Sequence, residues 1–321
     1  MDRITDLSVI IVNWNTAELL VQCLESLGVA SKRLSVETIV VDNASTDNSC
    51  DAVKKDFPSV RLMECNTNLG FSKANNLGIR AAAGQYICLI NSDVVLSESC
   101  LDRMYEYMDQ HSRIGILGPK VLNADGTLQG SIRQFPSVWN TLCRTLALDV
   151  LLPKSRLLGG FFMRFANPDQ VIAVDALSGC FWMVRRDALN QIGLLDEGFF
   201  MYAEDLDYCK RSRLKGWENV YFPEADIIHF GGASSARAPV RFLTENLKAT
   251  VRYLHKYHGP AERVLFSGAI LFLHLRRALT AMALYLLRST ERNKRLTEMK
   301  AHAACILWLM RISNTRIAST S

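Results

Sequence analysis

Short apolar runs alternate with stretches of helical character along the first third of the chain. Each run is rich in branched residues and ends in turn-forming residues, as a buried strand does; the runs cover 7–12, 36–43, 60–65 and 86–91. The stretches between them carry capping residues, such as Thr16, or apolar residues at helical spacing, and they predict helices over 16–27, 45–57, 72–83 and 97–111. This alternation predicts βαβ units, and hence an α/β fold with a mostly parallel sheet flanked by helices.

The alternation becomes irregular over residues 114–184, where we expect strands or hairpin arms. A helix and a last strand follow over 203–232. The helix predicted over 241–259 ends at a glycine, and the next residue is a proline that enforces the stop. These changes predict two domains, residues 1–240 and residues 241–321.

Length and cysteine usage bound the class of protein. The chain has 321 residues, of which 49% are apolar and 21% charged, as in a globular protein with a sizeable core. Its nine cysteines are scattered without CxxC pairs, which favours reduced thiols in the cytosol over a secreted disulfide scaffold or a zinc ribbon. The first apolar run is too short for a signal peptide and is followed at once by turn residues, so we interpret it as a strand.

Positive charge is concentrated in the last quarter of the chain. Residues 241–321 carry 14 Lys/Arg against 4 Asp/Glu, whereas the remainder has a small acidic excess. Such a tail favours an anionic surface, either a membrane or a nucleic acid. Because the tail lacks interleaved aromatic residues and a recognised nucleic-acid-binding module, we predict no nucleic-acid partner.

The stretch 264–287 is long and apolar enough to span a bilayer. His274, Arg276 and Arg277 lie near its middle, where charges are costly. We therefore expect a helix or helix pair that lies in the plane of an anionic membrane. The alternative is a basic helical bundle that packs on the first domain or pairs with a second copy as a homodimer.

Carboxylates stand where strands of the predicted sheet end. Asp42 lies at the end of the second apolar run, and Asp93 follows the fourth. In a parallel sheet both face the crevice beyond the carboxyl ends of the strands, where ligands bind. A further acidic cluster contains Glu204 and Asp205, and His229 follows the last strand. Carboxylate and imidazole groups with one open edge suit a hard divalent ion such as Mg²⁺ or Mn²⁺, which normally holds a substrate diphosphate.

Each of these groups also has a purely structural interpretation. Asp42 fits the N-cap of the next helix, and Asp93 fits a simple turn. Glu204 and Asp207 fit the first turn of a helix, where acids interact favourably with the helix dipole. His229 taken alone fits a hydrogen-bonded core histidine. On the residues alone, both interpretations stay open.

The segment "NTNLGFSKANNLGIR" (66–80) is rich in Asn and Gly ahead of a helix. Backbone N–H groups in such a loop are able to cradle a phosphate, which makes Asn68, Gly70 and Asn75 candidate binding residues. The segment matches neither the Walker loop nor the dinucleotide-binding fingerprint.

The order of the motifs is more specific than any one of them. The sequence contains, in this order, "SVIIVNWN", "VVDNASTDNS", "NLGFSKANNLGI", "LINSDVVL", "SGCFWMVRR", "GLLDEGFFMYAEDLDYCKRSRLKGW" and "IIHFGGAS". The series resembles the family 2 glycosyltransferases with the GT-A fold, in particular the rhamnosyltransferase-like branch that builds bacterial surface polysaccharides. The resemblance covers roughly residues 7–255.

By this resemblance, Asp93 matches the last acid of the family's D-x-D motif, which holds a metal ion on the donor diphosphate. The first acid is replaced by Asn91, which offers a carbonyl oxygen or a ribose contact without charge, and Ser92 stands between the two. His229 matches a histidine that completes the metal site in some relatives.

The same resemblance implies roles on both sides of the reaction. Asp42 matches the acid that contacts the base or ribose of the nucleotide, beside Asn13 and Asn15 of the first-strand loop. Asp205 matches the general base of the family's E-D pair, with Glu204 beside it. A positioned carboxylate of this kind takes the proton from an attacking acceptor hydroxyl.

The resemblance implies a transfer with inversion at the anomeric carbon. Because the processive motif Q-x-x-R-W is missing, we expect one sugar to be added per encounter. dTDP-L-rhamnose is the first donor to test, with a UDP-sugar as the other option, and a lipid-linked saccharide at the cytoplasmic membrane face is the expected acceptor. The alternative is a non-catalytic sugar-nucleotide-binding or scaffolding subunit. The replacement at Asn91 supports that alternative, and the retention of Asp93, Asp205 and His229 opposes it.

Overall fold

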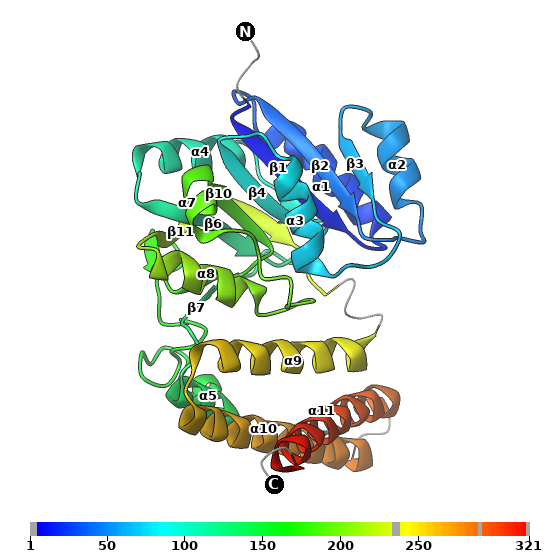
Figure 1. Ribbon diagram of the computed structural model, residues 1–321, viewed down its shortest axis with the longest axis vertical. Helices are drawn as coiled ribbons and strands as arrows, with labels where there is room; N and C mark the ends of the chain where they lie inside the picture. The colour runs from blue at the N-terminus through cyan, green and yellow to red at the C-terminus, as the bar shows by residue number, and fades with distance from the viewer. Residues whose placement is uncertain (1–4, 233–237, 288–290, 319–321) are drawn as a thin grey trace. The chain divides into compact units, whose positions relative to one another are not determined.

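The computed structural model of the chain describes residues 5–232, 238–287 and 291–318. The chain forms two compact units, and each is built from two separate stretches (Figure 1). The first unit combines Met1–Phe135 with Phe162–Ser234, and the second combines Pro136–Phe161 with Ser235–Ser321. The segment Pro136–Phe161 therefore clusters with C-terminal residues, although the sequence pattern groups it with residues 1–240.

Four parallel strands form one half of a nine-stranded sheet in the first unit (Figure 1). In their order across the sheet they are β3 (Arg61–Glu64), β2 (Val36–Asp42), β1 (Leu7–Asn13) and β4 (Tyr86–Asn91). The helices that connect them are α1 (Ala17–Ala30), α2 (Ser49–Asp56) and α3 (Phe71–Ala81). These elements confirm the alternating strands and helices that the apolar pattern predicts.

The other half of the sheet is mixed in direction. Strand β10 (Phe181–Arg185) runs antiparallel to both of its neighbours, β4 and β6 (Ile114–Leu122). Strand β11 (Glu218–His229) is parallel to β6 and antiparallel to β5 (Val94–Leu96) and β8 (Ile172–Val174). A separate ribbon pairs β7 (Ile132–Arg133) with β9 (Ala176–Leu177). The stretch expected to be irregular thus supplies β6 and β10, two central strands.

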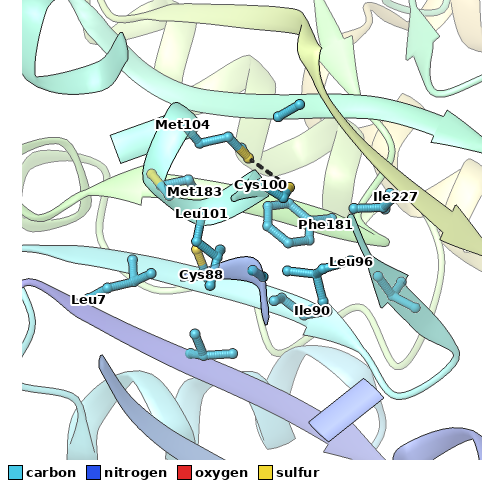
Figure 2. Close-up of a cluster of buried hydrophobic side chains, with 14 of the residues drawn as sticks. Leu7, Cys88, Ile90, Leu96, Cys100, Leu101, Met104, Phe181, Met183 and Ile227 are labelled. Atoms are coloured by element: carbon cyan, nitrogen blue, oxygen red, sulfur yellow. Dashed lines mark hydrogen bonds between the residues drawn. The ribbon is translucent and has the colours of Figure 1, made fainter. Parts of the chain in front are cut away.

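Helices cover both faces of the sheet, which explains why its central strands are apolar along their whole length. One layer contains α1, α2 and α4 (Cys100–Gln110). Figure 2 shows the core beneath it, where Leu101 and Met104 of α4 meet Cys88 of β4 and Phe181 of β10. Burial of this set fixes which face of each strand turns toward α4.

The opposite layer contains α3, α7 (Arg186–Ile192) and α8 (Glu204–Leu214). Helix α3 approaches the sheet closely at Gly78, where an added Cβ would lie 2.4 Å from Ile10 Cγ2. A larger residue at this position would push the helix away from β1. Helix α8 packs over β9 and β11.

The second unit is helical. It comprises α5 (Val138–Thr145), α6 (Leu148–Leu151), α9 (Pro239–Tyr257), α10 (Pro260–Leu287) and α11 (Arg292–Ala318). Helix α10 packs against α5 and α11, and the buried rings of His274 and His302 meet between α10 and α11 with their Nδ1 atoms 3.0 Å apart. Within the described residues, α10 is the helix whose length and composition would allow it to cross a membrane, and 17% of its most apolar stretch is buried.

Candidate active site

The carboxyl ends of β1 and β2 carry a fixed pair of polar side chains. The parallel register sets Asn13 beside Asp42, and Asn13 Nδ2 donates to Asp42 Oδ1 at 3.0 Å. The backbone N–H of Ser45 donates to Asp42 Oδ2 at 2.8 Å. Asn48, not Asp42, is the N-cap residue of α2, so the capping interpretation of Asp42 is wrong. The buried Asp42 carboxylate is held at the carboxyl end of β2, as its place at the end of the second apolar run predicts.

Hydroxyl groups tie the end of β1 to the end of β4. Thr16 Oγ1 donates to Asn13 Oδ1 at 2.7 Å and lies 2.8 Å from Ser92 Oγ. Thr16 holds the N-cap position of α1, but its hydroxyl serves these contacts and not the cap expected of it. Asn15 adopts φ 56°, a left-handed conformation that Asn tolerates, and its Oδ1 accepts from the Thr46 N–H at 2.7 Å. Asn13, Asn15, Asp42 and Ser92 therefore form one connected polar edge.

Asp93 and His229 come together although 136 positions separate them in the chain. Asp93 lies in the tight turn between β4 and β5, and the antiparallel pairing of β5 with β11 sets Val94 opposite His229. His229 Nε2 lies 3.3 Å from Asp93 Oδ1 and 3.4 Å from Asn91 Nδ2. The side chains of Asp93 and His229 are 12% and 14% exposed, which leaves one side open to a ligand.

The chemistry of this group fits a divalent cation. Among the described residues, no three His, Cys, Asp or Glu side chains gather into a metal-binding cluster, so Asp93 and His229 stand as a pair. Asn91 Oδ1 is buried and, within the described part of the chain, has no hydrogen-bond partner. One carboxylate and one imidazole are donors that Mg²⁺ or Mn²⁺ accepts while keeping positions for water and substrate oxygens. The Asn91 amide oxygen would join them if the amide plane turned, because Nδ2 is the atom that faces His229 here.

The acidic cluster occupies the first turn of α8. Asp205 Oδ2 accepts from Arg133 Nη1 at 3.1 Å, and Asp205 Oδ1 accepts from the Leu206 N–H at 2.8 Å. Asp207 is fully buried and pairs with Arg211 Nε at 2.8 Å, a structural contact within the helix. Ala203, which immediately precedes Glu204 at the start of α8, has φ 57°, a strained conformation of the kind found at functional turns.

Burial changes the protonation of Glu204. Burial, and secondarily the negative charge of Asp205, raises the pKa of Glu204 to about 8. Glu204 Oε2 is buried, and no hydrogen-bond partner for it is found among the described residues. Glu204 therefore carries a proton at neutral pH, whereas a general base must be free to accept one.

The segment Ser178–Cys180 connects the two groups. The Asn91 N–H donates to the carbonyl oxygen of Cys180 at 2.9 Å, and an added Cβ at Gly179 would lie 3.4 Å from the Asp205 Cβ. Burial, with a smaller contribution from the charges of Asp93 and Asp205, raises the pKa of the Cys180 thiol to about 11. Asp93 and Asp205 thus both lie close to the same short segment.

The side chains of Asn68 and Asn75 in the Asn- and Gly-rich loop form hydrogen bonds within the protein. Asn68 Oδ1 accepts from the Gly70 N–H at 3.0 Å and from Asn43 Nδ2 at 3.1 Å. Asn75 Nδ2 donates to the carbonyl oxygen of Phe71 at 3.0 Å, within α3. Gly70 has φ 81° and packs against Phe200, so only glycine fits there. A contact between this loop and a donor phosphate stays a prediction.

Two polar residues of the site are not predicted from the sequence, and one aromatic residue near the motifs belongs to the core. Arg133 contacts Asp205, and Gln129 Oε1 lies 2.6 Å from His229 Nδ1. Both precede β8 in the stretch 114–184, where the sequence shows no local pattern that singles them out. Trp182 is buried and stacks on Tyr208 with ring centroids 5.7 Å apart, as a core residue does.

Comparison with known proteins gives consistent matches. The family model described as Glycosyl transferase family 2 matches residues 8–193. An N-acetylglucosaminyl-diphospho-decaprenol L-rhamnosyltransferase of Mycobacterium tuberculosis (strain ATCC 25618 / H37Rv) is 31% identical over 305 residues, which are 92% of this chain and 97% of that protein. The rhamnosyltransferase WbbL of Escherichia coli (strain K12) is 26% identical over 196 residues, 58% of this chain and 70% of WbbL.

Two solved structures resemble the fold at low sequence identity. The mannosyltransferase PcManGT from Pyrobaculum calidifontis, in complex with GDP-Man and Mn²⁺, has a TM-score of 0.56 at 15% identity over 96% of this chain and 88% of PcManGT. Staphylococcus aureus TarS has a TM-score of 0.52 at 14% identity over 92% of this chain and 55% of TarS.

Proposed function

Because the chain belongs to glycosyl transferase family 2, we propose that it transfers L-rhamnose from dTDP-L-rhamnose to a hydroxyl of a lipid-linked saccharide, with inversion at the anomeric carbon. The rhamnosyltransferase-like branch expected from the motifs is confirmed, and so is the GT-A-like α/β fold. One observation carries the choice of sugar and acceptor: the mycobacterial L-rhamnosyltransferase matches over nearly the whole of both chains.

The polar edge at β1, β2 and β4 supports the donor side of this proposal. Asp42 and Asn13 are fixed by each other and accept or donate toward the nucleoside at the strand ends. Asp93, His229 and Asn91 would hold Mg²⁺ or Mn²⁺, which when bound neutralises the charge that develops on the leaving diphosphate.

Asp205 supports the acceptor side. Its carboxylate takes the proton of the acceptor hydroxyl while the hydroxyl oxygen bonds to the anomeric carbon from the face opposite the diphosphate. The bond between that carbon and the diphosphate oxygen breaks in the same step, and the electron pair leaves with the nucleoside diphosphate. Glu204 holds a proton at neutral pH, because burial raises its pKa to about 8, so the role of base falls to Asp205.

The second unit supports binding to an anionic membrane at the inner face of the cell membrane. Of the 23 large apolar side chains that are exposed among the described residues, 18 lie in this unit, which holds about a third of the chain. They include Leu151 at 72% exposure in the segment Pro136–Phe161 and Leu287 at 80% in α10. Residues 241–321 add 14 basic against 4 acidic residues, which complements anionic lipid.

The first experiment measures release of nucleoside diphosphate from a panel of sugar nucleotides with Mg²⁺, Mn²⁺ or EDTA. Water acts as a slow substitute acceptor, so the saccharide need not be known. We expect turnover of dTDP-L-rhamnose that EDTA removes and that a short-chain diphospholipid-linked N-acetylglucosamine accelerates. Turnover of a different donor would overturn the choice of rhamnose. Silence with donor and acceptor both present would favour the non-catalytic binding subunit.

A further inference from the structure

The ring of His229 is held from the side that faces away from Asp93. His229 Nδ1 lies 2.6 Å from Oε1 of Gln129, a residue 100 positions earlier in the chain. His229 Nε2 faces Asp93 Oδ1 at 3.3 Å on the opposite edge of the ring. One ring nitrogen thus faces Gln129, and the other faces Asp93 and, at 3.4 Å, Asn91 Nδ2.

Gln129 is itself fixed in orientation. Its Nε2 donates to Asn123 Oδ1 at 2.8 Å and to the backbone carbonyl of His229 at 3.2 Å. Because an amide nitrogen only donates, these two acceptors leave Oε1 as the atom that faces the ring. Asn123 Nδ2 donates to Thr127 Oγ1 at 2.9 Å, which fixes the orientation of Asn123 in turn. The Gln129 N–H is anchored to the carbonyl oxygen of Val121 at 2.8 Å.

This chain of contacts determines which ring nitrogen carries the proton. Gln129 Oε1 only accepts, so His229 Nδ1 must donate to it. In a neutral imidazole the lone pair then belongs to Nε2, the atom that faces Asp93. A lone pair and a carboxylate that point at one another repel, and a cation between them relieves the repulsion. An acceptor on the far nitrogen is the usual means by which proteins orient a metal-binding histidine.

We propose that Gln129 is a positioning residue, which aims His229 Nε2 at the divalent ion of the donor site and fixes its tautomer. This inference rests on the proposed function, because that function places the ion between Asp93 and His229. Gln129 touches neither the donor nor the ion in this assignment. Its effect passes through the His229 ring, so loss of its acceptor oxygen should weaken metal binding by about 10- to 100-fold.

The test has two readouts, and one of them needs no metal. Long-range ¹H–¹⁵N correlation spectra of the full-length protein in EDTA report the tautomer of each of its six histidines. His229→Asn identifies the signals of His229 by their disappearance. We expect an Nδ1–H ring in the parent protein, an Nε2–H ring in Gln129→Leu, and an Nδ1–H ring again in Gln129→Glu, which keeps an acceptor.

The second readout is Mn²⁺ affinity, measured by the electron paramagnetic resonance signal of free Mn²⁺. We expect weaker binding in Gln129→Leu and near-parent binding in Gln129→Glu. Gln191→Leu is a matched control, because Gln191 Oε1 accepts from the ring N–H of Trp217 at 3.2 Å and lies outside the site described above. Melting temperatures confirm that each variant is folded.

The outcomes separate the inference from the function on which it rests. An unchanged tautomer and an unchanged Mn²⁺ affinity in Gln129→Leu would overturn the role of Gln129, and so would a ring protonated at both nitrogens in every variant. If Asp93→Ala and His229→Asn leave Mn²⁺ affinity unchanged, the metal site of the proposed function is wrong, whatever the tautomer spectra show.

Discussion

Arg133 Nη1 lies 3.1 Å from Asp205 Oδ2 and joins the short β7–β9 ribbon to the first turn of α8. The two side chains are 24% and 10% exposed, so solvent screens this ion pair only in part. Arg133 occupies one carboxylate oxygen, and the backbone N–H of Leu206 occupies the other. The orientation of the carboxylate is therefore set before any substrate arrives, as the general-base role proposed for Asp205 requires.

Asp205→Asn should remove transfer and leave donor binding intact. The amide cannot take the proton of the acceptor hydroxyl, and loss of a general base typically costs about 10²–10⁴ in rate. Nucleoside diphosphate release and donor calorimetry measure the two effects separately. Asp207→Asn is the matched control, because Asp207 pairs with Arg211 inside α8; it should lower stability while leaving turnover of the folded protein. Full activity in Asp205→Asn would refute its role as base.

Arg133→Met should lower turnover about tenfold with little change in the donor dissociation constant. The methionine keeps the length of the side chain but no longer fixes Asp205 Oδ2. We expect a stability loss of about 1 kcal/mol, because the pair is partly exposed. Steady-state kinetics and thermal melts check both numbers, and Arg133→Lys should recover part of the turnover. Equal rates in the parent protein and Arg133→Met would show that Asp205 is oriented without Arg133.

Asn91→Asp should bind Mn²⁺ at least about tenfold more tightly than the parent protein, because a second carboxylate adds charge beside Asp93 and His229. In EDTA the same variant should be less stable, since two carboxylates then repel without a cation. Melting temperatures with EDTA and with Mn²⁺ measure both effects. Asn91→Leu, which has a similar size and no oxygen, should bind more weakly than the parent. Identical Mn²⁺ affinity in all three proteins would place the ion elsewhere.

Glu204→Gln should stabilise the protein at alkaline pH. Burial raises the folded-state pKa of Glu204 from 4.5 to about 8, so between these values the folded state binds a proton that the unfolded state has released. Stability due to this group therefore falls as pH rises through that window. The neutral amide removes this loss, and we expect a gain of more than about 1 kcal/mol at pH 8 and almost none at pH 4.5.

Thermal melts of Glu204→Gln across this pH range test the prediction, with Glu224→Gln, an exposed glutamate, as the control. A gain that does not depend on pH would mean that packing, not protonation, is responsible. Retained turnover at pH 7 is also expected, because a glutamate that already carries a proton is not the base.

Leu151→Glu and Leu287→Glu should each weaken binding to vesicles of anionic phospholipid by about tenfold or more. Burying a leucine side chain in an apolar environment is worth about 2 kcal/mol, and an acid also repels the lipid charge. Co-sedimentation at low and high salt measures the change. Leu214→Glu is the matched control, since Leu214 is 68% exposed but lies in the first unit. If the chain forms a stable dimer in solution and does not bind vesicles, the exposed apolar residues serve self-association.

The sequence predicts well what depends on local pattern. The strands that end at Asn13, Asp42 and Asn91 are each an apolar run followed by polar residues, and a parallel sheet brings such ends together. His229 is found by its place at the end of the last strand. Contacts between distant segments are not predicted in this way. Insertion of β10 beside β4 depends on antiparallel pairing across about ninety residues, which no local periodicity reports.

Arg133 and Gln129 illustrate the same limit at the site. Each is an ordinary polar residue in a stretch without regular spacing, and its partner lies 72 or 100 positions further along the chain. Their contacts with Asp205 and His229 become visible only in the three-dimensional structure. The motif order recovers the residues that resemble those of the family, and it is silent about the residues that hold them in position.

The division of each unit into two stretches has a consequence for biosynthesis. Residues 136–161 leave the ribosome before strands β8, β10 and β11 of the sheet, yet Thr145 Oγ1 donates to the carbonyl oxygen of Ala269, more than a hundred residues later. The side chains of this segment that the folded unit buries, such as Cys143 and Thr145, therefore stay exposed, without their helical neighbours, until synthesis is almost finished. A nascent chain in this state is a natural client for a chaperone or an early lipid contact. A fragment ending at residue 240 would keep that exposure permanently and should precipitate.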